Sequence, residues 1–368
     1  MPNPCRRTEE MTTERNLDMP DPQRNDFPLL ADFTAALTSV AFGKWQERVD
    51  DYAHRAELAG ECRRLADLAF RDRDAAAREH LHDILTVVYA YEFSQSAARN
   101  PDQDPQPILR DVTSVLENAV LDNEFRQVPE ELLTGYPTGE KDYVRWLKAL
   151  IQDHPASTHP MYAEHLTNAA TVEDIRFLLA QETSLDPRFD DILAVMQFGA
   201  TGAEKMEIAA NYWDEMGNGE FADVHTTLFS QCLTSIGVDR GYIESNLLLA
   251  AKECGNISAG LALSRRHYLR AIGYYGVTEF LAPRRFRQLV TAWDRLGLPP
   301  EGKVYHDIHI NVDAHHAAGW YKNVIGPVVE RDPAAGREIA LGTFVRLNTS
   351  AYYLDRVLEV CLKQPLPA

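Results

Sequence analysis

The spacing of apolar residues restricts the fold of this chain more than any other feature of its sequence. From about Leu29 onward, apolar residues recur three and four positions apart, and hardly any segment alternates apolar and polar residues between hairpin turns. One such stripe consists of Leu81, Ile84, Leu85, Val88 and Tyr89. This spacing gathers apolar side chains on one face of an α-helix, whereas a half-buried strand needs a period of two. The sequence therefore predicts an all-α fold.

Proline-rich and polar stretches divide these helices into regions. Residues 1–27 are polar and charged, and we predict a disordered tail there. Residues 28–135 are predicted to form an N-terminal helical region, and 136–160, which prolines interrupt, a linker. Residues 161–368 are expected to form the second helical half. Its predicted helices span about 171–184, 204–216, 223–235, 257–280, 283–296, 303–329 and 333–362.

The composition argues against two classes of partner. The chain has 368 residues, with 55 Asp and Glu against 37 Lys and Arg, and a net charge of −18. Nucleic acids and anionic membranes both attract basic surfaces, so we expect neither as a partner. No apolar run approaches the roughly 20 residues of a membrane span, and the N-terminal residues lack the apolar segment of a secretion signal. We therefore expect a cytoplasmic protein.

The cysteines do not predict a disulfide framework. The five residues are scattered and have no CxxC spacing. We interpret them as reduced thiols and predict no zinc site from them. They are Cys5, Cys62, Cys232, Cys254 and Cys361.

The segment 305–316 holds four of the twelve histidines. At about 100° per residue, His309, Asp313 and His316 fall within an arc of about 60° on a helix. His315 points elsewhere. His306 shares the face one turn earlier and is a rival ligand that periodicity alone leaves open. Three side chains able to bind a metal thus point the same way.

A solvated polar stripe is the alternative interpretation of this face. The following turns contain Ala317, Trp320 and Val324, which indicates that the helix is largely buried. An unpaired buried aspartate would be costly, and a metal ion is the simplest positive partner. We therefore predict a metal site on this helix.

Further donors lie on apolar helix faces elsewhere in the second half. Glu182, Glu215 and Glu279 each follow apolar residues at helical spacing, and His225 has an apolar context. Each alone is explained as a residue at the rim of the core. Together they favour a shared cause, and mixed carboxylate and imidazole ligation suits non-haem iron or manganese. Four carboxylates and three imidazoles are too many for one ion and fit two ions bridged by carboxylates.

The order of these donors resembles that of the haem-oxygenase-like di-iron oxidases, which are often described as iron-containing redox enzymes. The segment 211–219, Asn-Tyr-Trp-Asp-Glu-Met-Gly-Asn-Gly, is similar to the second core helix of that family. The resemblance covers about residues 160–365. It rests on the order Glu182, Glu215-x9-His225, Glu279 and His309-x3-Asp313-x2-His316.

This resemblance implies a haem-oxygenase-like helical bundle in which those seven residues bind two ferrous ions that react with O2 as co-substrate. It also implies an external reductant and a small amine or amino-acid-like substrate. N-oxygenation of an amine to a hydroxylamine or nitro product in a biosynthetic pathway is the expected reaction. Oxidative C–C cleavage or desaturation of an amino acid or fatty acid is the alternative. The N-terminal region resembles extra helices through which some members dimerise, so we expect a homodimer.

Two non-enzymatic alternatives remain at this stage: an iron-binding or storage bundle, and a cofactor-free bundle with a polar pocket. Asn211, one turn before Glu215, and Asp307 are candidates to orient the histidines. Arg346 is a candidate to hold a substrate carboxylate or to pair with a buried acid.

Overall fold

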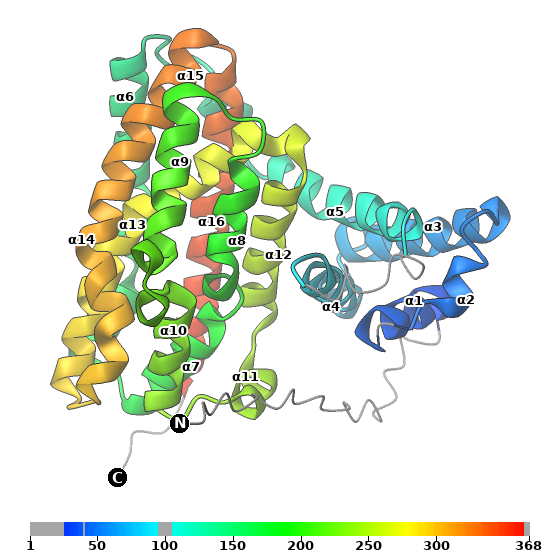
Figure 1. The fold of residues 1–368 in the computed structure, drawn as a ribbon, viewed down its shortest axis with the longest axis horizontal. Helices are drawn as coiled ribbons and strands as arrows, with labels where there is room; N and C mark the ends of the chain where they lie inside the picture. Colours follow the sequence, from blue (N-terminus) through cyan, green and yellow to red (C-terminus); the bar gives the residue numbers. More distant parts are fainter. Residues whose placement is uncertain (1–25, 40, 95–104, 364–368) are drawn as a thin grey trace, which may run out of the picture.

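The computed structural model describes residues 26–39, 41–94 and 105–363. Within these ranges every regular element is helical and there is no strand, which confirms the predicted all-α fold. Figure 1 shows two parts, a tall bundle of long helices and a smaller group of N-terminal helices beside it. The tail predicted at 1–27 lies outside the described residues except for Asp26 and Phe27, and Phe27 is buried.

The N-terminal group begins its helices with side-chain caps. Asp51 accepts a hydrogen bond from the His54 N–H, and Asp74 accepts one from the Ala77 N–H. Each carboxylate satisfies one of the amide groups that the first helical turn leaves free. The elements of this group are α1 (Pro28–Ser39), α2 (Gly43–Gln46), α3 (Tyr52–Ala66), η2 (Asp67–Arg71), α4 (Ala75–Glu92) and α5 (Ile108–Arg126).

The bundle is built from the remaining helices, with α13 and α16 packed against each other at its centre. Its first elements are η5 (Glu130–Leu133), α6 (Glu140–Asp153), η6 (Pro155–Thr158), η7 (Met161–Ala169), α7 (Val172–Glu182), η8 (Asp186–Arg188), α8 (Phe189–Met196), α9 (Gly202–Glu215), η9 (Gly217–Gly219), η10 (Phe221–Asp223), α10 (His225–Ser235) and α11 (Arg240–Asn246). Its later elements are α12 (Leu249–Leu263), η11 (Arg265–His267), α13 (Tyr268–Arg295), η12 (Pro300–Lys303), α14 (Val304–Gly319), η13 (Trp320–Ile325), α15 (Gly326–Arg331) and α16 (Ala335–Lys363).

The two central helices approach closely because glycines face the partner backbone. A Cβ atom at Gly273 of α13 would collide with the carbonyl oxygen of Ile339, and one at Gly342 of α16 would collide with that of Arg270. Any larger residue at either position would push the helices apart. This crossing fixes α13, which also packs against α14.

The structure differs from the sequence-based predictions at a predicted linker and at a predicted helix break. The segment 136–160, predicted as a linker, contains α6, whose buried Tyr143, Leu147 and Ile151 lie at a spacing of four and pack it against the bundle. The break predicted before Pro283 does not occur, because α13 continues through this proline. The chain instead breaks earlier, at η11, between α12 and α13. Pro283 removes one backbone hydrogen bond, and packing on α14 and α16 keeps the helix continuous.

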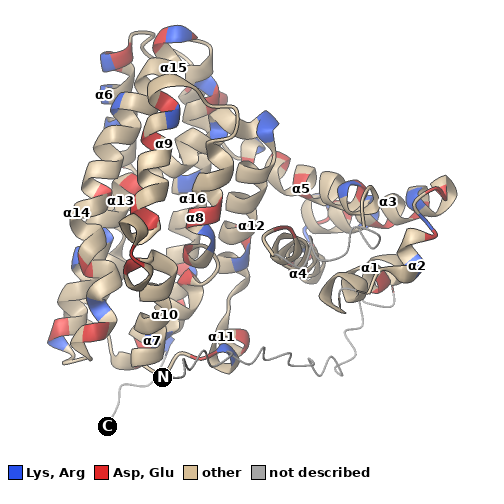
Figure 2. Cartoon of the chain, in the orientation of Figure 1, with Lys and Arg blue, Asp and Glu red and all other residues tan. Residues whose placement is uncertain are grey.

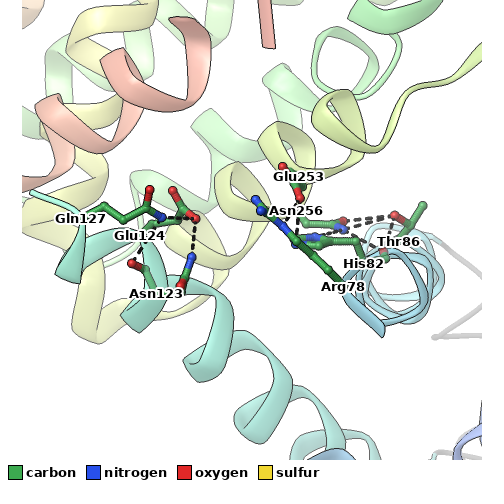
Figure 3. Close-up of polar contacts among 8 residues, drawn as sticks. All are labelled: Arg78, His82, Thr86, Asn123, Glu124, Gln127, Glu253 and Asn256. Atoms are coloured by element: carbon green, nitrogen blue, oxygen red, sulfur yellow. Dashed lines mark hydrogen bonds and ion pairs between the residues drawn. The ribbon is translucent and has the colours of Figure 1, made fainter. Parts of the chain in front are cut away.

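Polar contacts join the N-terminal helices to α12 of the bundle (Figure 3). Arg78 Nε lies 2.5 Å from Glu253 Oε1, and the Asn256 side-chain amide donates to the His82 carbonyl over 2.9 Å. Lys252 Nζ lies 2.6 Å from Asp83 Oδ1 at the more exposed edge of this interface. Arg78 and Glu253 also line a cavity of about 170 Å³ between α4, α5, α12 and α16. The N-terminal group is therefore attached through a buried charged interface.

Charges of both signs are spread over the molecule. Figure 2 shows acidic and basic residues side by side on the bundle and on the N-terminal helices. None of the described helices is long and apolar enough to cross a membrane.

Burial of Glu253 makes this interface sensitive to pH. Burial raises the pKa of its carboxyl from 4.5 to about 7, although Arg78 acts in the opposite direction. The folded protein thus binds this proton more tightly than the unfolded chain, and the resulting stability is complete below pH 4.5 and lost as the pH rises through 7. We expect the stability of the wild type relative to Glu253→Gln to fall by up to about 3 kcal/mol across this window.

Urea unfolding of both proteins at several pH values measures this difference. Glu79→Gln, an exposed change on the neighbouring helix α4, is the control and should keep the wild-type pH profile. Equal pH slopes for the wild type and Glu253→Gln would contradict the expectation.

Candidate metal centre

Helix α14 carries three of the predicted donors on one buried face. His309, Asp313 and His316 are each only 4% exposed. The adjacent His315 is exposed and its Nδ1 lies 2.9 Å from the Asn311 carbonyl oxygen. The arrangement agrees with the arc expected from the helical period.

The first group of donors joins α14 to α9 and α10. Glu215 ends α9, His225 begins α10, and both meet His309. Glu215 Oε2 lies 2.7 Å from His225 Nδ1, and Glu215 Oε1 lies 3.9 Å from His309 Nε2. One donor atom from each residue lies within 4.8 Å of the other two. We refer to Glu215, His225 and His309 as the first triad.

The second group joins α14 to α13. His316 Nδ1 lies 3.6 Å from Glu279 Oε2 and 3.8 Å from Asp313 Oδ1. These three donors also lie within 4.8 Å of one another, and all three residues are buried. We refer to Glu279, Asp313 and His316 as the second triad.

Special backbone positions follow the two glutamates, a glycine turn after Glu215 and a proline four residues after Glu279. Gly217 has φ +61°, and a Cβ atom there would lie 2.6 Å from the Asp223 carbonyl carbon. Only glycine fits this left-handed, crowded position, so the chain turns back after α9 and starts α10 beside Glu215. In α13, Pro283 has no N–H to donate to the carbonyl four residues earlier, which belongs to Glu279.

Hydrogen bonds on the outer side orient two of the imidazoles. His316 Nε2 lies 2.9 Å from Asp214 Oδ2, and His309 Nδ1 lies 2.5 Å from the Tyr305 carbonyl oxygen. Donation of an N–H through these nitrogens leaves the opposite nitrogen of each ring facing its triad with a free lone pair. This is the arrangement that outer partners usually impose on metal-binding histidines.

The donors fit a cation better than they fit one another. Within the described part of the chain, the buried atoms His225 Nδ1, His316 Nδ1 and Glu279 Oε1 make no hydrogen bond. His225 Nδ1 lies close to Glu215 but lacks the alignment that a hydrogen bond needs. Ring nitrogens and carboxylate oxygens that converge without bonding to each other are the donor set expected around a metal ion.

The charges of the two triads shift the pKa values of their members. Burial acts to raise the pKa of Glu215, but contacts with His225 and His309 lower it to about 2. Burial acts to lower the pKa of His316, but Glu279, Asp214 and Asp313 raise it to about 10. Burial, reinforced by Glu279, raises the pKa of Asp313. These carboxylates therefore need positive charge, which protonated imidazole or a cation supplies.

A cavity of about 40 Å³ borders both triads. Its walls include members of both triads, together with Asp186 and the rings of Phe286 and Tyr305. Asp186 lies in the short turn η8 after α7, and within the described residues its Oδ2 atom is buried and accepts no hydrogen bond. Asp186 cannot be predicted from helical periodicity, because it lies in a turn, where the period says nothing about the direction of a side chain.

The structure brings together six of the seven predicted ligands and leaves out Glu182. The Glu182 carboxylate accepts a hydrogen bond from the Tyr353 hydroxyl over 2.7 Å, and it interacts electrostatically with the buried Arg285 and Arg346. The rival ligand His306 also lies in neither triad.

The structure also shows the surroundings of the four other residues that the sequence suggested near the site. His306 Nδ1 lies 3.9 Å from Cys232 Sγ. Asn211 is buried beside the core, and its amide makes no hydrogen bond to any described residue. Asp307 is exposed, so it does not orient the buried histidines. Arg346 donates to the Thr278 hydroxyl at the cavity wall over 3.0 Å. The partner that the sequence analysis did not find is Asp214.

A helical bundle with carboxylates and imidazoles projecting inward from facing helices is typical of proteins that bind iron in this way. Residues 176–351 match the model of the iron-containing redox enzyme family. The match runs from α7 into α16 and contains both triads. Together with the all-α architecture, it indicates a haem-oxygenase-like fold and an iron-dependent oxidoreductase. No curated protein matches the chain at a significant level.

The contact between Asp214 and His316 yields a test of the outer partners. Asp214→Asn retains the size of the side chain but removes the charge that holds His316 Nε2–H. We expect the affinity of the second triad for Fe²⁺ to fall by about 10- to 100-fold, because outer partners of metal-binding histidines contribute effects of this size. Anaerobic Fe²⁺ titration measures it. Glu220→Gln, an exposed change in the following turn, is the control, and equal affinity for all three proteins would contradict the assignment.

Proposed function

We propose that the protein is a non-haem di-iron, O2-dependent oxygenase that acts on a small amine-containing metabolite, with N-oxygenation as its reaction. The observation that carries the proposal is the pair of buried triads, members of which line one cavity. Glu215, His225 and His309 would hold one ferrous ion. Glu279, Asp313 and His316 would hold the other.

The triads suit two ferrous ions by charge and by donor number. Their three carboxylates supply −3 against the +4 of two Fe²⁺, which leaves the site slightly positive in place of a buried negative cluster. Three protein donors per ion leave coordination positions open, and the bound ions would supply electrons and binding positions for O2. Conversion of an amine to a hydroxylamine by O2 also consumes two electrons and two protons and forms water. The external reductant in the proposal provides the electrons.

The remaining cavity residues suit an amine. Asp186 is half-buried, and its buried Oδ2 accepts no hydrogen bond from any described residue. Burial, reinforced by Glu182, raises the pKa of this carboxyl, so a cationic partner would stabilise its charged form. The rings of Phe286 and Tyr305 line the cavity beside Asp186. We propose that Asp186 binds the substrate ammonium group and orients its nitrogen toward the triads.

Oxidative C–C cleavage or desaturation remains the alternative reaction, since the same donors would serve it. An iron-storage role is the non-enzymatic alternative. It would oxidise iron without forming an organic product.

The proposal is tested by loading the protein with Fe²⁺ under anaerobic conditions and then adding O2, reductant and amine substrates. We expect two irons per wild-type chain and products that gain oxygen on nitrogen in mass spectrometry. His316→Ala should bind about one iron and lose turnover, because the second triad loses a donor. His315→Ala, the exposed neighbour on the same helix, should behave as the wild type.

Each other outcome decides against part of the proposal. Full iron binding by His316→Ala would refute the second triad as a metal site. Cleaved or desaturated products would favour the alternative reaction, and iron oxidation with no organic product would favour storage.

Asp186 gives a separate prediction about substrate binding. We expect Asp186→Asn to keep both irons but to raise KM for an amine substrate by about 10- to 100-fold, the effect of one lost charge-assisted hydrogen bond. Steady-state kinetics with an amine substrate measures the change. Asp191→Asn, an exposed aspartate on α8, is the control and should leave KM unchanged. A loss of iron from Asp186→Asn would instead identify this carboxylate as a metal ligand.

A further inference from the structure

A third cluster of metal-binding side chains lies outside the two triads. His165 of η7, Asp174 of α7 and Cys361 of the last turn of α16 each offer one donor atom, and these atoms lie within 4.8 Å of one another. The side chains of His165 and Asp174 are 10% and 4% exposed, and Cys361 is also buried. Two regions far apart in the sequence, η7 with α7 and the end of α16, thus meet at the end of the bundle where Figure 1 labels α7.

The hydrogen bonds of Asp174 leave one oxygen free. Its Oδ2 accepts from the Thr171 N–H over 2.8 Å and from the Thr171 hydroxyl over 2.9 Å, as part of the capping box that begins α7. Its Oδ1 atom is buried and accepts no hydrogen bond from the described residues. The cap therefore holds the Asp174 carboxylate in place through Oδ2 and leaves Oδ1 without a hydrogen bond.

The imidazole of His165 makes no hydrogen bond to the Asp174 carboxylate. His165 Nε2 lies 3.2 Å from Asp174 Oδ2, yet this nitrogen is buried and makes no hydrogen bond within the described part of the chain. A structural ion pair would align the N–H with an oxygen lone pair. His165 Nε2 and Asp174 Oδ1 are both buried without a hydrogen bond, and both lie beside a thiol. A metal ion bound by all three residues explains this better than pairing between His165 and Asp174.

The donor types select the ligand. A nitrogen, an oxygen and a sulfur donor together suit Zn²⁺, which accepts all three and adds water as a fourth ligand. Bonds of about 2.0–2.3 Å place tetrahedral donors roughly 3.5 Å apart, so small rotations of the His165 and Cys361 side chains would complete the site. Neither central triad contains sulfur, so this cluster differs chemically from the proposed iron centre.

We infer that His165, Asp174 and Cys361 form a zinc site that ties the end of α16 to the start of α7. Cys361 binds as the thiolate and releases its proton to solvent. The site is independent of the proposed oxygenase activity. It differs from the sequence-based expectation that no cysteine serves zinc, and the partners of Cys361 lie almost 200 positions away in the chain.

Cobalt provides the test, because Co²⁺ replaces Zn²⁺ and shows a thiolate charge-transfer band when sulfur is a ligand. Full-length protein is stripped with a chelator and titrated with Co²⁺. We expect the saturated band to have the intensity of one thiolate-bound Co²⁺ per chain and to disappear when Zn²⁺ is added. Cys361→Ala should abolish the band. Cys62→Ala and Cys232→Ala, which remove other buried cysteines, should retain it.

A second variant covers the case in which Cys361→Ala fails to fold. His165→Gln keeps the thiol and should weaken Co²⁺ binding by at least about tenfold, with the charge-transfer band still present at saturation. Absence of the band in the wild type, its persistence in Cys361→Ala, or unchanged affinity in His165→Gln would each overturn the inference. The result is independent of iron binding, because a His309→Ala variant should keep the cobalt band.

Discussion

Three carboxylates buried next to one another impose the main constraint on this bundle. Glu215, Glu279 and Asp313 lie in a core where unpaired charge is costly, and three imidazoles accompany them. The fold holds these side chains in position through its backbone and through an outer hydrogen bond. The Gly217 turn returns the chain beside Glu215, and Asp214 holds one imidazole from outside. The surrounding features are thus explained by the need to hold acids where only a cation satisfies them.

The sequence predicted the parts of the site that depend on helical geometry. The rotation per residue of an α-helix is fixed, so the shared direction of His309, Asp313 and His316 follows from their spacing alone. The helix predicted from about residue 171 likewise agrees with the start of α7, where Thr171 and Asp174 form a capping box within the first turn. The family resemblance supplied the order of the donors, and the structure shows how six of them converge.

The remaining features depend on contacts between distant segments. Asp186 lies in a turn, where no period indicates direction, and Glu182 lies on a helix but faces Tyr353. The predicted linker proved to contain α6, because prolines at both sides of an amphipathic helix resemble those of a loop. The cluster around Cys361 cannot be predicted from the sequence, because its three members share no motif.

Helix α14 contributes donors to both triads, and this has a consequence for iron loading. His309 faces the first triad, while Asp313 and His316 face the second. The first ion to bind would fix the rotation and height of this helix for both positions. The second ion then meets donors that are already ordered, so less conformational entropy is lost when it binds. Loading should therefore be cooperative, and half-loaded chains should be scarce.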